Sequence, residues 1–516
     1  MSQPHADLIL TNARLFTPDA PSSGENLVAI SRGRILHVGP AGDLPALRRP
    51  HTRVVDCQGA TLLPGFIDAH IHLFAAAANL AAVDCSPAAV SSVPAIVDAL
   101  RRAAERTPPG QWLRAWGYDE YSLHEQRHPT RWDLDRAAPL HPVKLSHRSG
   151  HACVLNSAAL ERLGIGPHTP EPPGAVLERD LASGELTGYC LELEAFLESR
   201  GVPTLPAAEI ERLVPLMVQR LAALGVTCIH DATPARALDQ FDLLRSWHAA
   251  GRIPIRVRKM MAPSDLPALA ARGLGYRSGD DALRIGPVKI MLNETAQRAL
   301  PDTEELRGIV LAAQNAGFPC SFHAADESGL RAALNAIAFA QERGAPAHPH
   351  RIEHCGLCTP DLLPEIARLR AAVVTQPGFI AAHGDRYAAL IPPHRRRWLY
   401  RIASLAHAGI PLAFGSDAPI TPPGPLATIA AAILRRTSAG LSIAPEEAVS
   451  LAQALACHTS APAALAGDGS LLGRIAPGYA ADLVQLSGDP YVTPAEALMS
   501  LRIQRTWVNG DLVWEA

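Results

Sequence analysis

Short apolar runs alternate with longer helical stretches through the central part of the chain. The apolar runs between residues 225 and 419 are GVTCIHDA, PIRVRKMM, RIGPVKIML, FPCSFHAA, HRIEHC, AAVVTQP and IPLAFGSDAP. The stretches between them are rich in Ala, Leu and Arg, which is typical of amphipathic helices. A repeated strand-then-helix order predicts a parallel sheet, and about eight such units predict a closed barrel. We therefore expect an α/β protein with a (β/α)8 TIM barrel.

Both ends of the chain show a different pattern. Near the start, runs rich in Ile, Leu and Val between Gly and Pro residues predict short antiparallel strands at Leu8 to Thr11, Leu27 to Ser31 and Arg34 to Val38. From Gly478 onward, ADLVQLSGD and TWVNGDLVWEA again predict strands, and Asn509-Gly510 is a hairpin signal. The two ends are therefore expected to pair with each other in one small domain.

The predicted domain layout has three parts. Residues 1–62 and 467–516 form a composite β-sandwich domain, and residues 63–466 form the barrel. An insertion over residues 85–194 interrupts the strand-and-helix rhythm, and its prolines surround the aromatic residues Trp112, Trp116, Tyr118, Tyr121 and Trp132. We expect this insertion to cover the barrel mouth, where loops shape the substrate site. Its aromatic side chains either form the core of this cover or bind an apolar part of the substrate.

Composition narrows the class of protein. The chain has 516 residues, 48% of them hydrophobic and 19% charged, which fits a globular protein with a sizeable core. Basic and acidic residues number 47 and 50, with no dense basic stretch beyond Arg395 to Arg397, so nucleic acid is not an expected partner. Without a signal-peptide pattern or an apolar run of about 18 residues, we expect a cytoplasmic protein with no membrane partner. The nine cysteines, an odd number, predict free thiols, and the Cys355–Cys358 pair has no second pair to complete a zinc site.

Two histidines follow the first apolar strand in LLPGFIDAHIHL. The side-chain period of two in a strand directs His70 and His72 the same way, so both imidazoles can bind one metal ion. An HxH pair alone does not identify a metal site. Three more metal-type side chains lie where later strands end: His323 in CSFH, His354 in RIEH and Asp417 after AFGS. A barrel brings such strand ends to one mouth, so the five side chains together predict a metal centre.

Several motifs along the chain, including those that carry these side chains, resemble the motifs of a known family. PGFIDAHIH, a mid-barrel VK, FHAAD, RIEH and GSDAP look like successive motifs of the amidohydrolase superfamily, in its order. SGHACVLNSAAL, ELTGYCLELE, GVTCIHDA, TQP and GSDAPITPPGPL resemble the amidohydrolase-3 branch, which includes N-substituted formamide deformylases. GRIAPGYAADLVQLSGDP and TWVNGDLV resemble the C-terminal strands of the family, so the resemblance covers nearly the whole chain.

The resemblance implies a binuclear centre of two divalent metal ions, with Zn²⁺ as the default. It assigns His70, His72 and Asp417 to one ion, and His323 and His354 to the other. Lys289, in GPVKIML, sits where the family has a lysine carboxylated by CO₂ that bridges the ions. A buried lysine needs its charge removed or paired, and carboxylation turns it into an anionic oxygen ligand. The alternative is that it pairs with an acid. Asn293-Glu294-Thr295 departs from the Asp-Gly segment usual here, and Glu294 becomes a candidate pocket residue.

The resemblance also implies a mechanism in which the two ions lower the pKa of a shared water towards about 7 and polarise the substrate carbonyl. Asp417 would act as general base, and His151, in SGHACVLN, resembles a histidine that stabilises the oxyanion, with a structural role as its alternative. His230 and Asp231 are candidate partners of a metal ligand, with a structural role as the alternative. Gln376 and Arg386 are candidate pocket residues, with contacts to backbone groups and a solvated loop face as their respective alternatives. Arg386 and Tyr387 are expected in a loop over the pocket.

The leading hypothesis is hydrolysis of a carbon–nitrogen bond in a small amide, N-formyl compound or cyclic amide by metal-activated hydroxide. One alternative is a mononuclear deaminase of a ring amidine, but SFHAADES lacks the HxxE pattern of that class. A metal-free scaffold protein is the non-enzyme alternative, although the complete set of ligands argues against it. The expected partner is a small-molecule substrate, and the family suggests a homodimer.

Overall fold

The computed structural model describes residues 5–17, 20–21, 26–294, 299–344 and 348–516. It divides into two compact units. The first, called the barrel unit here, comprises Met1–His72, Val218–Asn293 and Pro301–Ala516. The second, called the inserted unit, comprises Leu73–Met217 and Glu294–Leu300.

Eight parallel strands form the centre of the barrel unit, in the order β22-β21-β20-β19-β16-β15-β14-β7. Their bounds are β7 Phe66–Ile71, β14 Val226–Asp231, β15 Arg256–Met261, β16 Leu283–Met291, β19 Cys320–Ala324, β20 Arg351–His354, β21 Ala372–Thr375 and β22 Leu412–Phe414. Almost every residue of these strands is buried, as expected where helices cover the outer face of a parallel sheet. The predicted α/β class and the eight parallel strands are confirmed.

The barrel is nearly closed, because backbone hydrogen bonds cross the seam between β22 and β7. The backbone N–H of Asp417 donates to the carbonyl oxygen of His70 over 2.7 Å. The backbone N–H of His72 donates to the carbonyl oxygen of Ala418 over 2.8 Å. These two bonds fix the segment after β22 against the end of β7, so the first and last chemical motifs of the barrel become neighbours.

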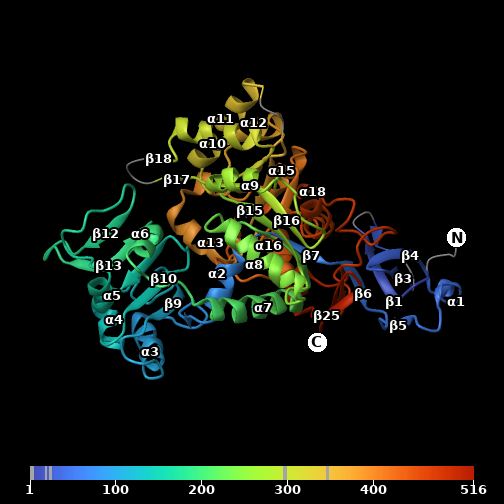
Figure 1. The fold of residues 1–516 in the computed structure, drawn as a ribbon, viewed down its shortest axis with the longest axis horizontal. Coiled ribbons are helices and arrows are strands. Elements are labelled where there is room, and N and C mark those ends of the chain that lie inside the picture. The colour runs from blue at the N-terminus through green and yellow to red at the C-terminus, as the bar shows by residue number, and fades with distance from the viewer. Residues whose placement is uncertain (1–4, 18–19, 22–25, 295–298, 345–347) are drawn as a thin grey trace. The chain divides into compact units, whose positions relative to one another are not determined.

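Helices follow the barrel strands, as the pattern predicted. In the barrel unit they are α8 Ala237–Ala249, α9 Leu266–Ala271, α10 Thr303–Asn315, α11 Glu327–Glu342, α12 Leu362–Arg368, α13 Gly378–Leu390, α14 Pro393–Arg396, α15 Ile402–His407, α16 Pro425–Leu434, α17 Leu451–Ala456 and α18 Ser460–Leu465. Figure 1 shows α10, α11 and α12 beside one another. Helix α7, Ala207–Ala223, precedes β14. None of the helices in the described part of the chain is long and apolar enough to cross a membrane.

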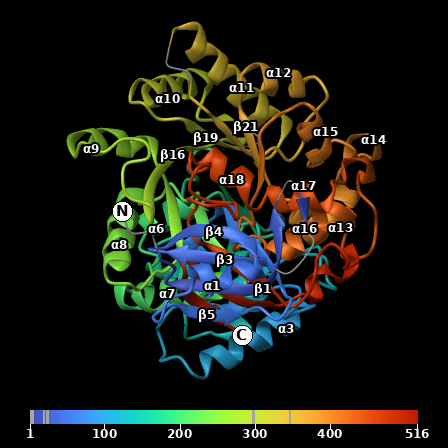
Figure 2. The same ribbon diagram turned by 90° about the vertical axis from the view of Figure 1, so that its right-hand side faces the viewer.

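Strands from both chain ends share one sheet with the path β25-β24-β23-β6-β1-β3-β4, to which β2 and β5 add by pairing with β1. Their bounds are β1 Leu8–Thr17, β2 Ala20–Pro21, β3 Asn26–Ser31, β4 Arg34–Pro40, β5 Arg53–Asp56, β6 Thr61–Pro64, β23 Leu483–Leu486, β24 Ile503–Val508 and β25 Asp511–Glu515. Figure 2 shows β1, β3 and β4 side by side. The predicted pairing of the two ends is therefore present, and its division into two sandwich layers stays a prediction.

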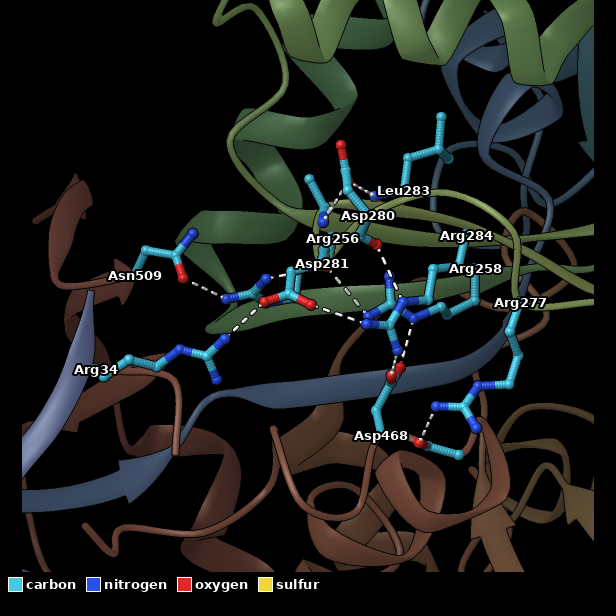
Figure 3. Close-up of polar contacts among 12 residues, drawn as sticks. Arg34, Arg256, Arg258, Arg277, Asp280, Asp281, Leu283, Arg284, Asp468 and Asn509 are labelled. Atoms are coloured by element: carbon cyan, nitrogen blue, oxygen red, sulfur yellow. Dashed lines mark hydrogen bonds and ion pairs between the residues drawn. The ribbon is translucent and has the colours of Figure 1, made fainter. Parts of the chain in front are cut away.

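Buried arginines of the barrel strands bind acidic residues of the C-terminal segment, and Figure 3 shows the contacts of Asp468. Arg256 Nε donates to Asp482 Oδ2 over 2.7 Å, and Arg258 Nε donates to Asp468 Oδ2 over 2.5 Å. Arg284 also contacts Asp468. Since breaking a buried ion pair on one side costs about 3 to 5 kcal/mol, these contacts strongly favour one placement of the C-terminal segment on the barrel.

The inserted unit has its own six-stranded sheet, in the order β12-β13-β11-β10-β9-β8. Its strands are β8 Val83–Asp84, β9 Leu113–Tyr118, β10 Val143–His147, β11 Ala152–Leu155, β12 Val176–Arg179 and β13 Leu186–Leu191. Its helices are α2 Leu73–Asn79, α3 Val93–Ala104, α4 Arg131–Ala137, α5 Ser157–Arg162 and α6 Glu194–Ser199. Two short strands, β17 Asn293–Glu294 and β18 Ala299–Leu300, pair with each other. Tyr118 is fully buried, whereas Tyr121 and Trp132 are about two-fifths exposed at 41% and 40%.

All nine cysteines are buried free thiols, as the odd number predicted. Burial raises the pKa of Cys57 to about 11 and that of Cys85 to about 12. Neutral buried thiols pack as small apolar groups, so they add to the core rather than to redox chemistry.

Two buried histidines away from the metal-type cluster predict acid sensitivity. Burial lowers the pKa of His350 and of His458 to about 4, and the backbone N–H of Cys320 donates to His350 Nδ1. The unfolded chain, with histidine pKa values near 6.5, binds more protons below that pH. The free energy of unfolding should therefore fall below about pH 6.5, by up to about 1.4 kcal/mol per pH unit for each histidine. Urea unfolding at several pH values measures this slope.

The matched variants are His350→Gln and His168→Gln, because His168 is exposed. The slope should become shallower in His350→Gln and stay unchanged in His168→Gln. Equal slopes in all three proteins would contradict the assignment of a neutral buried imidazole at position 350.

Candidate metal centre

The six predicted metal-binding residues all belong to the barrel unit and lie toward the C-terminal ends of its strands. They are His70 and His72 on and just after β7, Lys289 on β16, His323 on β19, His354 at the end of β20, and Asp417 after β22. The strand order brings these ends to one side of the barrel.

Asp417 lies at the centre of the group. Its Oδ1 atom is 3.4 Å from His70 Nε2 and 3.2 Å from His72 Nε2. Ligand atoms of His70, His354 and Asp417 lie within 4.8 Å of one another, and all three residues are buried. The His323 ring centroid is 4.5 Å from that of His354. The five side chains are therefore close enough to share one or two metal ions.

Three of the histidines are oriented by a partner at Nδ1. His70 Nδ1 is 2.5 Å from Glu353 Oε2, His72 Nδ1 is 2.9 Å from Thr233 Oγ1, and His354 Nδ1 is 2.9 Å from Gln376 Oε1. A protonated Nδ1 that donates to oxygen leaves Nε2 unprotonated, which is the form that binds a metal ion. His70 Nε2 and Asp417 Oδ1 are buried and have no hydrogen-bond partner among the described residues. Buried nitrogen and oxygen atoms without a hydrogen-bond partner fit a site in which they bind a cation.

Glu353 is a functional residue that the sequence interpretation missed. Its carboxylate accepts from Ser321 Oγ over 2.6 Å and from Arg351 Nε over 2.8 Å, in addition to the bond with His70. Burial alone would raise its pKa, but Arg351 and His70 hold the pKa well below its usual range. Glu353 is therefore a carboxylate that fixes the His70 ring. The available signal in the sequence was the Arg-x-Glu pair inside a buried strand, because charged side chains are seldom buried unless each has a partner.

Asp68 is the second missed residue, and it ties the two ends of the barrel seam together. It accepts from the Ser416 backbone N–H over 3.0 Å, from Ser416 Oγ over 2.6 Å, and from the His70 backbone N–H over 3.2 Å. The GSDAP turn is thereby held against the HxH segment. The period of two in FIDAHIH was the available signal, because it places Asp68 on the same face as His70 and His72.

Lys289 is buried, with 1% of its surface exposed, and its Nζ has no hydrogen-bond partner among the described residues. Burial lowers its pKa to about 8, although Glu353 and Asp417 partly oppose this shift. An unpaired buried ammonium group is costly, so a larger fraction of Lys289 is the neutral amine near neutral pH than in an exposed lysine. The alternative raised by the sequence, a direct ion pair with an acid, is absent from the described contacts.

Residues of the CIHDA motif contact the side chains that orient the proposed metal ligands. Lys259 Nζ donates to Asp231 Oδ1 over 3.1 Å and to the Thr233 carbonyl over 2.5 Å, and the Thr233 backbone N–H donates to Asp231 Oδ1 over 2.9 Å. Asp231 thus positions the threonine that contacts His72. Arg351 Nη1 lies 3.1 Å from His230 Nδ1, which joins His230 to the arginine that binds Glu353.

Not every candidate residue belongs to the barrel unit or to the expected element. His151 belongs to the inserted unit, where its Nδ1 is 2.8 Å from Glu192 Oε1, and its role toward substrate stays a prediction. The side chain of Glu294 lies outside the described residues. The expected loop at Arg386 and Tyr387 is wrong, because both residues lie in helix α13. Pro377 occupies the N-cap of that helix, so the Gln-Pro pair begins a helix here rather than a loop.

Gly415 allows β22 to approach β7 beside the cluster. A Cβ atom at this position would lie 2.6 Å from the His70 backbone nitrogen and 2.9 Å from its Cα. Backbone atoms cannot yield as a side-chain tip can, so Gly415→Ala should displace His70 and reduce metal binding at least about tenfold. Metal titration of the purified variant measures this loss. Gly308→Ala is the control, since a Cβ in helix α10 meets nothing within 4 Å and should leave metal binding unchanged. Unchanged metal affinity in Gly415→Ala would contradict the close approach.

Comparisons with known proteins show the family to which this chain is related. The profile described as the Amidohydrolase family matches residues 53–514. An N-substituted formamide deformylase of Arthrobacter pascens is 30% identical, over 99% of this chain and 98% of that protein. A putative amidohydrolase of Bacillus subtilis, YtcJ, is 28% identical over 90% of this chain and 91% of that protein. A solved metal-dependent hydrolase of Pyrococcus horikoshii has a TM-score of 0.76 at 24% identity, over 95% of this chain and 99% of that chain, which shows the likeness of fold.

Proposed function

This chain belongs to the amidohydrolase family, and we propose that it hydrolyses a non-peptide carbon–nitrogen bond of a small amide with the help of two divalent metal ions. The observation that carries the proposal is the group His70, His72, His354 and Asp417, in which oriented imidazoles meet a carboxylate in a buried site. Imidazole nitrogens and carboxylate oxygens are the ligands that suit Zn²⁺.

His70, His72 and Asp417 would hold one ion, and His323 and His354 the other. When bound, the ions supply a Lewis acid for the substrate carbonyl and lower the pKa of a water towards about 7. Burial and Lys289 lower the pKa of His70 to about 3, so this imidazole is neutral and able to bind metal near neutral pH. The Nδ1 partners of His70, His72 and His354 would hold all three rings in place for the same task.

Lys289 would complete the site after carboxylation. The neutral Nζ adds to the carbon of CO₂, an N–C bond forms, and one proton leaves the nitrogen, which gives a carbamate with one negative charge. This change removes a buried cation that has no direct partner and supplies two oxygen ligands. Its position on β16, between the histidines of β7 and those of β19 and β20 in strand order, supports a bridging role.

Asp417 would move the proton in the reaction. Burial alone would raise the pKa of Asp417, but the neighbouring imidazoles of His72, His70 and His354 hold it below its usual range, so the group is a carboxylate. It can take the proton of the attacking water and then donate it to the nitrogen of the leaving amine as the carbon–nitrogen bond breaks. The left-handed backbone of Asp417, with φ at 57°, fits a residue held in place for a defined task.

N-substituted formamides are the first substrates to test, because the relative from Arthrobacter pascens is named as a deformylase of such compounds. The test compares N-formyl amines, N-acetyl amines and a cyclic amide, with a dipeptide as the control substrate, and measures release of the amine. We expect turnover of at least one amide, loss of turnover with a chelator, and recovery when Zn²⁺ is returned. Failure of the metal-restored protein to release amine from any of these amides would overturn the proposal.

A further inference from the structure

The inserted unit contains a cavity whose lining includes none of the proposed site residues. Its volume is about 890 Å³, within the range of small-molecule pockets. Helix α3, the start of β9, the end of α5 and the segment before α7 supply its lining. Trp112, which is half-buried, lies in this lining and offers an aromatic surface.

The cavity lining carries more positively than negatively charged side chains. Its lining carries two carboxylates, Asp84 and Glu209, and four guanidinium groups, Arg102, Arg106, Arg114 and Arg162. The whole chain has a net charge of −3. The cavity lining therefore has a net charge of the opposite sign to that of the chain. A concave surface with an excess of one charge attracts ligands of the opposite sign.

Arg102 and Arg106 lie four residues apart along one face of α3 and the turn after it. Like charges at this spacing destabilise a helix by about 0.2 to 0.5 kcal/mol. Within the described residues, neither arginine forms an ion pair with a carboxylate, whereas the neighbouring Arg101 lies 2.5 Å from Asp98. The two arginines of the cavity therefore keep their charge available at a small cost in stability.

The other two arginines are held in place without being neutralised. Arg162 Nη1 donates to the carbonyl oxygen of Gly110 over 2.7 Å, and Arg114 Nη2 donates to the carbonyl oxygen of Pro203. Both acceptors are neutral backbone groups, so the positive charge remains. A guanidinium fixed by one hydrogen bond still presents its other N–H groups to a ligand.

We propose that this cavity binds a small organic polyanion, a compound with two or more phosphate or carboxylate groups. Guanidinium groups pair with both kinds of oxyanion through parallel hydrogen bonds, and arginines from three separate elements can contact several such groups at once. This binding site lies outside the group of metal-type residues and is independent of the proposed hydrolysis.

Calorimetric titration of the full chain at low salt tests the proposal, with inorganic pyrophosphate and citrate as the two probes. Arg102→Glu and Arg101→Glu form a matched pair, because they are neighbours on one helix and only Arg102 lines the cavity. We expect a single site whose affinity falls at least about tenfold in Arg102→Glu and less than about twofold in Arg101→Glu. Arg106→Glu should behave like Arg102→Glu.

Binding of pyrophosphate alone would identify a phosphorylated ligand, and binding of citrate alone a polycarboxylate. The proposal is overturned if the wild-type protein binds neither probe, or if both variants of the matched pair lose affinity equally. Amide hydrolysis is not the readout, so failure here leaves the proposed function untouched.

Discussion

Asp417→Asn is expected to reduce kcat/KM for the amide substrate by about a hundredfold to ten-thousandfold. Asparagine keeps the shape of the side chain but cannot accept the proton of the attacking water. It also removes the negative charge that lies 3.2 Å from His72 Nε2 and 3.4 Å from His70 Nε2. Turnover and bound metal are measured together, because the carboxylate is both the proposed base and a proposed ligand.

Excess metal separates these two roles. If Asp417 acts as a base, turnover stays low in the variant even when metal content is restored. Recovery of full turnover under saturating metal would contradict the base role and leave ligation alone. Asp242→Asn is the control, because this surface carboxylate pairs with Arg272 and should leave kcat/KM within about twofold.

Glu353→Gln is expected to weaken metal binding by about tenfold to a hundredfold and to lower the free energy of unfolding by about 3 kcal/mol. The first effect arises because a neutral amide holds the His70 ring less firmly and makes its Nε2 less basic. The second arises because Arg351, with 4% of its side chain exposed, loses its charged partner. Metal titration and urea unfolding measure the two effects separately.

A double variant distinguishes orientation of the ligand from general damage to the fold. Arg351→Met combined with Glu353→Leu replaces both buried charges and should recover much of the stability while metal binding stays weak. Glu365→Gln is the surface control, since Glu365 and Arg368 are about half-exposed and their pair contributes roughly 0 to 1 kcal/mol. Unchanged metal affinity in Glu353→Gln would refute the positioning role.

Most of the barrel could be predicted from the sequence because its strands are buried on both faces and read as continuous apolar runs. The motifs GSDAP, RIEH and HxH lie at the ends of these strands, and a closed barrel places its strand ends at one mouth. The parallel order of β7, β19 and β20 confirms this reasoning. A pattern of local runs was sufficient here, because each barrel strand pairs mainly with its neighbours in sequence.

The supporting residues could not be predicted in the same way, since their partners are distant in sequence. Glu353 contacts His70 across 283 positions, and Ser416 contacts Asp68 across 348. Periodicity shows which face a side chain takes but not which side chain it meets there. The expected loop at Arg386 is wrong for a local reason: helix α13 begins directly after Pro377, and proline is favoured at the start of a helix.

Two measurements test the bridged binuclear centre most directly. The first is the metal content per chain of the wild-type protein and of Lys289→Met, and the second is the mass of the intact wild-type chain under CO₂. Methionine keeps the volume of the buried side chain but cannot be carboxylated. We expect about two metal ions per wild-type chain, a mass increase of one carboxyl group, and loss of at least one ion in the variant. One ion per chain in both proteins, with no added mass, would contradict the bridged binuclear centre and favour the mononuclear alternative.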